Sequence, residues 1–403
     1  MRRILITDEI KGFANDYSLK MEDEENFRQG GSPKARLLAL SNQLKRAGTV
    51  VKIQKQKARK GHPVVYTKYN GRDFTALSDY VKAIYDNYDG LNALLPSEWD
   101  MKISQKVDDK LKGYDIRDIK VKLPRHRACP FFELVVDAMR YDKVQSDIMP
   151  TYIRKLGIKT CVYCNAQFAT TAIIQEVTQG KKGMPKTKTI EIACYELDHN
   201  KAKSVYPYLC TNFYNLQPSC SSCNRRKNDR ELDFSLYYED GDTDITPVHF
   251  ALAPTDIIDF RKSNKCKGVK PYLCNEGKDF PPVLSDNVTK AGKLNKMLGI
   301  QSVYDEHEDI VEEILWKHKI YSKGYMSATI AQLNTLGLDG FDVKRFILGG
   351  YYGREDDFLK RPLSIMKNDI WEQLCKTIRQ SQNHKRVRLG FLQERPSCPR
   401  NSL

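Results

Sequence analysis

Four of the eleven cysteines in this chain constrain its fold more than any other feature of the sequence. Cys161 and Cys164 form one C-x-x-C pair, and Cys220 and Cys223 form a second. Because each pair presents two thiolates from one tight turn, two pairs complete a tetrahedral zinc site with no position left for a substrate. We therefore predict a structural Zn²⁺ ion. The alternative is four unrelated buried cysteines.

The segment between the two cysteine pairs has the pattern of a β-hairpin. Residues 170–178 and residues 187–197 are rich in β-prone side chains, and the sequence between them contains Gly180, Gly183 and Pro185. We expect an inserted hairpin, which accounts for a gap between the pairs that is longer than in a plain zinc ribbon.

Apolar residues at helical spacing dominate the sequence on both sides of this segment. One helix is predicted to begin at Ser32 and Pro33 and to end at Gly48, because these residue types favour helix ends. Further helices are predicted over 77–87, over 131–139 and beyond residue 290.

The predicted fold class is α+β, with a small zinc-held core between mainly helical regions. The expected divisions are a basic, mainly helical region over 1–155, the zinc-bearing domain over 156–235, and a mainly helical region with a basic tail over 236–403.

The charge balance favours a polyanionic partner. Lys and Arg number 66 and Asp and Glu number 51, so the formal net charge is +15. Excess positive charge favours nucleic acid first and anionic lipid second, although a soluble basic protein has the same composition. Residues 31–70 contain ten basic side chains and no acidic one, and 385–388 form a basic tail. Both segments are candidates for phosphate contacts, with a solvated basic surface as the alternative.

The sequence does not predict a membrane or secreted protein. No apolar run approaches the ~20 residues that a membrane helix needs. Asp8 and Glu9 stand where a signal peptide has its apolar stretch. We therefore expect a cytoplasmic protein without a membrane partner.

Asp198 and His199 are adjacent at the end of a predicted strand. Because adjacent strand residues point to opposite sides, one can bind a metal while the other faces a substrate if the strand end bends. A carboxylate is a hard oxygen ligand for Mg²⁺, and an imidazole accepts a proton near neutral pH. The alternative is a surface pair, or a histidine whose hydrogen bonds are satisfied within the fold.

More polar residues accompany the second cysteine pair. Asn224 directly follows the last cysteine and offers either a second oxygen ligand on a rigid backbone or a helix cap. Asn215 can hydrogen-bond the histidine from behind or form a turn with its own backbone. Three basic residues would lie near phosphates or form an exposed helix face: Arg225, Arg226 and Lys227.

The order Asp-His at 198–199, Asn-Leu-Gln at 215–217 and Cys-x-x-Cys-Asn-x-x-Lys at 220–227 resembles the HNH endonucleases of the ββα-metal superfamily. The resemblance spans residues 158–232. It implies His199 as general base, Asp198 and Asn224 as ligands of a catalytic Mg²⁺ or Mn²⁺, and Asn215 as the residue that holds the histidine. It also implies four structural zinc ligands, namely Cys161, Cys164, Cys220 and Cys223.

The activity implied by this resemblance is hydrolysis of phosphodiester bonds in DNA. RNA, including tRNA, is an alternative substrate because nothing in the motif recognises the sugar. A non-catalytic, zinc-held nucleic-acid-binding module is the second alternative. The large helical extensions resemble the layout of HNH nuclease subunits in bacterial anti-phage systems of the Septu type, which implies an effector role and an ATPase partner subunit. The oligomeric state stays open.

Overall fold

The computed structural model describes residues 2–46, 49–53, 74–111, 113–179, 185–232, 235–242, 248–275, 288–321, 323–338, 340, 342–349 and 357–376. Within these residues the chain combines helices with small two- and three-stranded sheets, so the predicted α+β class is confirmed. The chain divides into two compact units, Arg2–Ile245 and Thr246–Leu403. The regions 1–155 and 156–235 of the sequence-based division therefore lie together in the first unit.

The first unit contains most of the described strands and the segment with the two cysteine pairs. Its helices are α1 (Asp8–Glu22), α2 (Pro33–Leu44), α3 (Phe74–Asp86), α4 (Gln105–Asp108), α5 (Phe131–Ala138), α6 (Tyr141–Lys143), α7 (Met149–Lys155) and α8 (Ser221–Lys227). Its strands are β1 (Ile4–Leu5), β2 (Val50–Ile53), β3 (Ile119–Lys122), β4 (Cys129–Pro130), β5 (Thr170–Gln179), β6 (Pro185–Cys194), β7 (Glu196–His199), β8 (Leu216–Ser219) and β9 (Tyr237–Tyr238).

Helix α2 begins where the sequence predicts. The Ser32 hydroxyl accepts a hydrogen bond from the Ala35 amide at 3.3 Å, and Pro33 occupies the first turn. The helix ends at Leu44, and Gly48, the predicted end, lies outside the described residues, as do 54–70 of the basic segment. The helices predicted over 77–87 and 131–139 are confirmed as α3 and α5.

An aromatic cluster joins distant parts of the first unit. Tyr17 of α1, Tyr152 of α7 and Phe213, just before β8, lie with ring centroids 5.4–6.0 Å apart. Strand β1 pairs in parallel with β9, and the Arg3 guanidinium donates to the Ser235 carbonyl at 2.9 Å. The start of the chain is thereby attached to the segment that follows α8.

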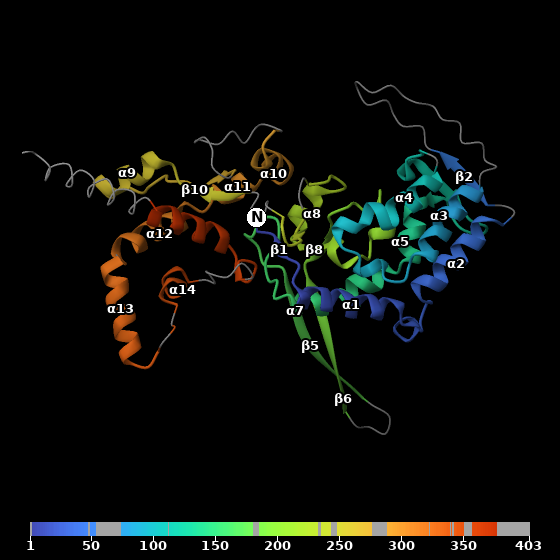
Figure 1. The fold of residues 1–403 in the computed structure, drawn as a ribbon, viewed down its shortest axis with the longest axis horizontal. Coiled ribbons are helices and arrows are strands. Elements are labelled where there is room, and N and C mark those ends of the chain that lie inside the picture. Colours follow the sequence, from blue (N-terminus) through green and yellow to red (C-terminus); the bar gives the residue numbers. More distant parts are fainter. Residues whose placement is uncertain are drawn as a thin grey trace, which may run out of the picture. The chain divides into compact units, whose positions relative to one another are not determined.

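The predicted hairpin between the cysteine pairs is confirmed. Strands β5 and β6 pair antiparallel over ten positions, from Thr170 opposite Cys194 to Gln179 opposite Pro185. The hairpin extends away from the helices of the first unit (Figure 1). The predicted second strand over 187–197 is split at Tyr195, because β6 pairs with β5 whereas β7 pairs with β8.

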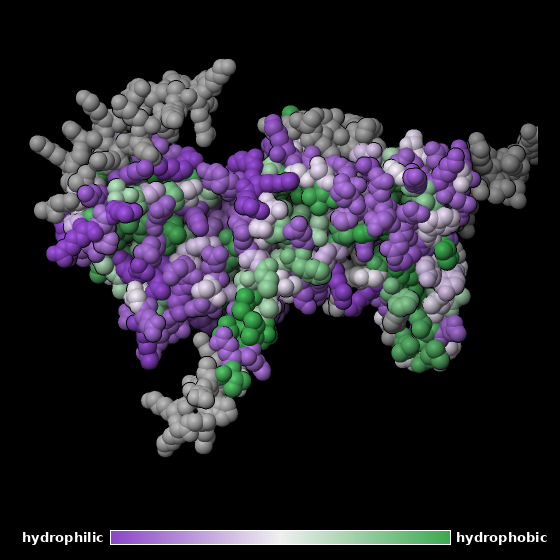
Figure 2. All heavy atoms as spheres, turned by 180° about the vertical axis from the view of Figure 1, so that it is seen from behind, coloured by the Kyte–Doolittle hydropathy of each residue, from purple (hydrophilic) through white to green (hydrophobic). Residues whose placement is uncertain are grey.

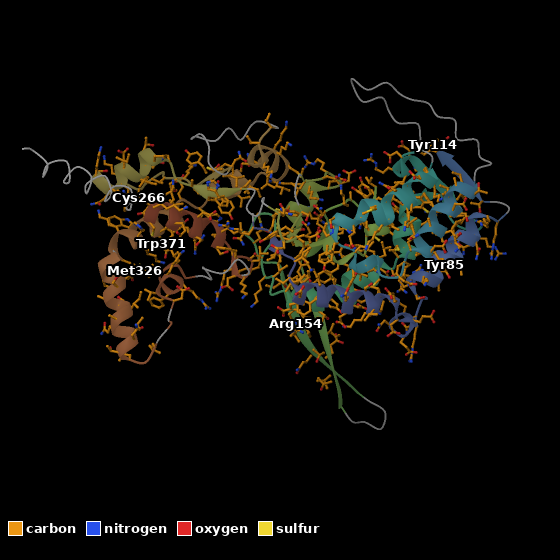
Figure 3. The ribbon with its side chains drawn as sticks, in the orientation of Figure 1. Tyr85, Tyr114, Arg154, Cys266, Met326 and Trp371 are labelled. Atoms are coloured by element: carbon orange, nitrogen blue, oxygen red, sulfur yellow. The ribbon has the colours of Figure 1, made fainter. Side chains whose placement is uncertain are left out.

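The hairpin is anchored near its base and carries apolar side chains into solvent farther out. Arg154 of α7 donates to the Glu191 carboxylate at 2.7 Å, and Figure 3 shows Arg154 where α7 meets the strands. Ile173 and Val177 are 53% and 68% exposed. Figure 2 shows hydrophobic side chains gathered along this arm. The segment 180–184 lies outside the described residues.

The second unit is mainly helical, as the sequence predicts. It comprises β10 (His249–Ala251), α9 (Pro254–Ser263), β11 (Tyr272–Cys274), α10 (Lys290–Leu298), α11 (Ile300–Tyr304), α12 (Glu308–Ile320), α13 (Lys323–Thr335), α14 (Val343–Leu348) and helical residues 364–376.

Side-chain to backbone bonds tie the small sheet of the second unit to its last helical segment. Phe250 of β10 stacks on Tyr304 with ring centroids 4.1 Å apart. The Phe250 amide donates to Asp369, and the Gln373 side chain bonds both the amide and the carbonyl of Leu252. The basic tail at 385–388 lies outside the described residues. Among the described helices, none has both the length and the apolar character of a membrane span.

Candidate functional site

The four cysteines of the two C-x-x-C pairs meet in one buried cluster. The sulfur atoms of Cys161, Cys164, Cys220 and Cys223 lie within 4.8 Å of one another. A tetrahedral zinc ion with Zn–S bonds of ~2.3 Å holds its sulfurs ~3.8 Å apart, so small side-chain movements suffice to bind it. All four cysteines are buried. The cluster can therefore hold a metal such as zinc.

The first pair forms a tight turn shaped by its backbone. The Asn165 amide donates to the Cys161 carbonyl at 2.9 Å, and the Ala166 amide points at the Cys164 sulfur at 3.5 Å. Asn165 adopts a φ of 52°, a left-handed conformation that asparagine tolerates better than most residues. Its side chain donates to the Thr160 hydroxyl at 3.0 Å. These hydrogen bonds close the turn.

The second pair connects the cluster to the elements that carry the polar residues. Cys220 is the N-cap residue of α8, and the backbone N–H of Asn224 donates to the Cys220 carbonyl at 3.0 Å. The Val162 amide of the first turn donates to the Pro218 carbonyl of β8 at 3.2 Å. The cluster therefore fixes where α8 starts relative to the β7–β8 ribbon.

The face of the β7–β8 ribbon toward α8 is polar. In the antiparallel register Asp198 lies opposite Gln217 and Glu196 lies opposite Ser219, and directly opposed residues share a face. From α8, the side-chain amide of Asn224 donates to the Glu196 carboxylate. A polar group that is removed from water is costly unless it is hydrogen-bonded, so the partners of these side chains matter for the stability of the ribbon.

Asp198 lies in the interior of this face, beside a buried cation. The Lys227 ammonium is 3.1 Å from the Asp198 carboxylate and donates to the His199 carbonyl at 2.7 Å, and the Tyr163 hydroxyl also bonds Asp198. Burial raises the pKa of the Asp198 carboxyl, whereas Lys227 and Tyr163 oppose that rise.

Lys227 is buried, which corrects both the expectation that it lies near phosphates and the alternative that it lies on an exposed basic helix face. Its side chain has no exposed surface, and its charge is directed to Asp198. The physical reason is helical geometry. Lys227 is three residues from Asn224 and shares its ribbon-facing side, while Arg225 and Arg226 point outward and are exposed.

His199 is held on the opposite face of β7 in a buried environment. Its Nε2 lies 3.0 Å from the Cys210 carbonyl oxygen, and its ring lies 4.8 Å from that of Tyr141. A carbonyl oxygen only accepts hydrogen bonds, so Nε2 carries the proton and Nδ1 of the neutral ring holds the lone pair. Burial, with a contribution from Lys203, lowers the pKa of His199 to about 3, so the ring stays neutral.

The side chain of Asn215 is hydrogen-bonded to backbone groups of the neighbouring loop, in contrast to the expectation that it bonds the histidine directly. Its amide oxygen accepts from the Lys201 amide at 2.7 Å, and its Nδ2 donates to the Lys201 and Leu209 carbonyls at 3.1 and 2.9 Å. Lys201 and Leu209 belong to the loop that also carries Cys210. Asn215 therefore acts on His199 through the loop whose carbonyl receives Nε2.

The structure brings some of the predicted residues together and separates others. Asp198 and Asn224 both lie where α8 covers the ribbon, but their bonded partners there are Lys227 and Glu196. The His199 imidazole is on the other face. Sequence reasoning missed three residues that complete the arrangement, Glu196, Gln217 and Tyr163. The alternation of Glu196 with Asp198 is the signal that indicates a shared face.

The carboxylates of Glu196 and Asp198 and the side-chain amides of Asn224 and Gln217 bring oxygen atoms to this face of the ribbon. The Asp198 carboxylate is already bonded by the Lys227 ammonium and the Tyr163 hydroxyl. Compared with known proteins, the chain matches no family model, and no curated protein or solved structure is significantly similar to it.

Proposed function

We propose that this chain is a metal-dependent HNH-type endonuclease that hydrolyses phosphodiester bonds in DNA. Its ββα-metal core would consist of β7, β8 and α8, which follow one another in the chain and are clamped by the four-cysteine cluster. The order of the two strands and the helix, together with the Asp-His pair at the end of the first strand, supports this proposal.

The observation that carries the proposal is the fixed tautomer of His199. With Nε2 bonded to the Cys210 carbonyl, Nδ1 is the ring nitrogen that holds the lone pair. In the proposed reaction Nδ1 accepts a proton from water as the water oxygen attacks phosphorus. The bond from phosphorus to the 3′ oxygen breaks, that oxygen takes up a proton, and the products carry 5′-phosphate and 3′-hydroxyl ends.

The residues on the α8 side of the ribbon would hold the divalent cation. Asp198 and Asn224 are the proposed ligands, with the Glu196 carboxylate bonded to Asn224. His199 is the last residue of β7, and the proposal requires the strand end to bend so that Nδ1 faces the same phosphate as a cation bound at Asp198. A bound Mg²⁺ or Mn²⁺ would polarise that phosphate and stabilise negative charge on the leaving oxygen. The chain's own residues fix the loop, the histidine tautomer and the carboxylate, and the exposed Arg225 and Arg226 supply positive charge on α8.

Cleavage assays with matched histidine variants test the proposal. We expect His199→Ala to lower the cleavage rate by about 10²–10⁴-fold, because a positioned general base contributes that much. His318→Ala is the control, since His318 is also partly buried against an aromatic ring, that of Trp371, but belongs to the second unit. It should retain activity.

The assay uses plasmid DNA, single-stranded DNA, and RNA including tRNA, each with Mg²⁺, with Mn²⁺ or with a chelator that leaves the zinc content unchanged. Cleavage of RNA but not DNA would show that the substrate is RNA, the alternative given above. Full activity of His199→Ala would refute the assigned base. Nucleic-acid binding without cleavage under every condition would favour a zinc-held binding module.

A further inference from the structure

Lys203, in the loop between β7 and β8, shares an aromatic neighbour with the proposed general base. Its ammonium lies 4.5 Å from the centroid of the Tyr141 ring, and the centroid of the His199 ring lies 4.8 Å from that of Tyr141. Tyr141 is buried, and its hydroxyl donates to the Leu197 carbonyl of β7 at 2.9 Å, so its ring is held in place. The ammonium and the imidazole are therefore separated by no more than the sum of the two distances.

The carbonyl that orients the imidazole belongs to the same loop as Lys203. Cys210 supplies this carbonyl, which lies 3.0 Å from Nε2 of His199. Burial raises the pKa of the Cys210 thiol, and the positive charge of Lys203 opposes that rise. Because Coulomb interactions weaken with distance, this effect agrees with the ring contacts in placing the ammonium near the proposed base.

The charge of Lys203 is available to an anionic ligand. Within the described part of the chain, no carboxylate pairs with its ammonium, whereas Lys201, two residues earlier, pairs with Glu231 at 3.0 Å. Lys203 is half-buried, so a solute can reach its ammonium while the contact with Tyr141 restricts the side chain. A cation that is both accessible and restricted in this way loses little entropy when it binds an anion.

A phosphate within reach of His199 needs positive charge near the imidazole. Lys227 does not supply it, because its side chain is fully buried and paired with Asp198 on the α8 side of the ribbon. The N–H groups of an ammonium form charge-assisted hydrogen bonds with phosphate oxygens, and partial burial reduces the solvent screening of the attraction. The short span between the Lys203 ammonium and the imidazole suits one phosphate group together with the water that attacks it.

We propose that the Lys203 ammonium binds the nucleic-acid phosphate on which His199 acts. The ammonium donates a hydrogen bond to a non-bridging phosphate oxygen and stabilises the negative charge that this oxygen gains in the transition state. Lys203 transfers no proton, so the balance of the hydrolysis described above is unchanged. The inference rests on the proposed function for the identity of the anion, whereas binding of a phosphate at Lys203 can be measured without cleavage.

Binding of labelled DNA, followed by fluorescence anisotropy at several salt concentrations, tests the phosphate contact. A chelator that leaves the zinc content unchanged prevents cleavage. Lys203→Met should weaken binding by roughly tenfold and reduce the slope of log affinity against log salt by about one, because one phosphate contact is lost. Lys201→Met is the matched control, since it removes an equal charge from the same loop but one already paired with Glu231. Its slope should equal that of the wild type.

Nuclear magnetic resonance of the histidine rings tests whether the phosphate lies beside the base. The chain contains seven histidines, and His199→Ala identifies the His199 signal. Inorganic phosphate should shift this signal in the wild type, in Lys201→Met and in the charge-conserving Lys203→Arg, but not in Lys203→Met. An equal shift in Lys203→Met, or no shift in the wild type, would overturn the inference. Equal midpoints of urea unfolding confirm that the variants are folded.

Failure of this inference is distinguishable from failure of the proposed function. If Lys203→Met binds and cleaves DNA as the wild type does, the role of Lys203 is overturned and the proposed nuclease stands. If phosphate binds beside His199 through Lys203 but neither DNA nor RNA is cleaved, the nuclease is overturned and the phosphate site stands. If both proposals hold, Lys203→Met should lower kcat/KM for cleavage by roughly tenfold to hundredfold, and Lys203→Arg should restore most of that loss.

Discussion

At the scale of single residues, the buried pair of Lys227 and Asp198 is the most consequential contact of the candidate site. Both side chains are almost completely removed from solvent, and the ammonium also bonds the His199 carbonyl. Taking two charges out of water is costly, and the mutual attraction only offsets that cost while both partners are present. The pair therefore makes the site sensitive to removal of either charge.

We expect Lys227→Met to lower the free energy of unfolding by about 3–5 kcal/mol, because the Asp198 carboxylate would remain buried without its partner. Urea unfolding followed by circular dichroism measures the change. Arg225→Met, on the exposed side of the same helix, should stay within about 0.5 kcal/mol of the wild type. Equal effects for the two variants would show that the ammonium is not buried with Asp198.

Residue identities were predictable to the extent that they depend on local spacing. The two cysteine pairs predict a shared cluster, because two C-x-x-C turns in one chain are typical of a metal site. The burial of Lys227 was predictable, because residues three apart share a helix face and Lys227 therefore lies on the face of Asn224, unlike Arg225 and Arg226. The bonding of Asn215 to the Lys201 and Leu209 backbone was not predictable, because it depends on which neighbours surround an amide in three dimensions.

At the scale of elements, the cysteine cluster connects the Cys161–Cys164 turn, the β7–β8 ribbon and α8. Cys220 caps α8, and Val162 of the first turn bonds β8. A bound metal would make these three elements one rigid piece, and its binding free energy would then contribute directly to folding.

We expect the wild type to contain one equivalent of zinc and Cys220→Ser to contain much less. Its free energy of unfolding should fall by more than about 4 kcal/mol, because loss of a structural metal is one of the few single changes with so large an effect. Elemental analysis and thermal unfolding measure the two effects. Cys194→Ser alters an exposed cysteine outside the cluster and should change neither. Full zinc content in Cys220→Ser would contradict a four-thiolate site.

The hairpin shows where element prediction from sequence ends. Its two strands are recognisable from β-prone runs on either side of a glycine-containing turn. The break at Tyr195 is not, because residues 187–197 form one continuous β-prone run. What divides them is a change of partner from β5 to β8, and pairing between distant segments is a tertiary property.

At the scale of the whole molecule, the helices of residues 1–155 support the candidate site rather than merely preceding it. The loop between β7 and β8 is bonded by several of them. Tyr17 donates to the Thr211 carbonyl, Asn212 bonds the Leu91 carbonyl, and Tyr208 donates to Asp108. This loop carries the Cys210 carbonyl that fixes His199, so the N-terminal helices determine its position.

We therefore expect residues 1–245 expressed alone to fold, to unfold cooperatively and to bind one equivalent of zinc. Residues 156–245 alone should fail to give dispersed nuclear magnetic resonance signals for the loop, because its partners are missing. Zinc analysis and NMR of both fragments provide the comparison. A well-folded 156–245 fragment would show that the N-terminal helices are dispensable for the site.

Sequence reasoning placed a boundary at residue 155 because the character of the sequence changes there, from helical stripes to cysteine turns and strands. The contacts that unite the two regions come from isolated polar and aromatic residues such as Tyr17 and Asn212, which follow no periodic pattern. The ATPase partner and the anti-phage role depend on resemblance alone and stay predictions.

Because β5 and β6 pair residue by residue, the length of this hairpin can change without altering the rest of the first unit. Thr170 and Cys194 face each other where the arm leaves the body, so its two ends are neighbours. Removing or adding one facing pair changes the arm by about 3.4 Å and leaves these ends in place. Evolution or protein engineering can thus lengthen or shorten the hairpin while the two cysteine pairs on either side of it stay in one cluster.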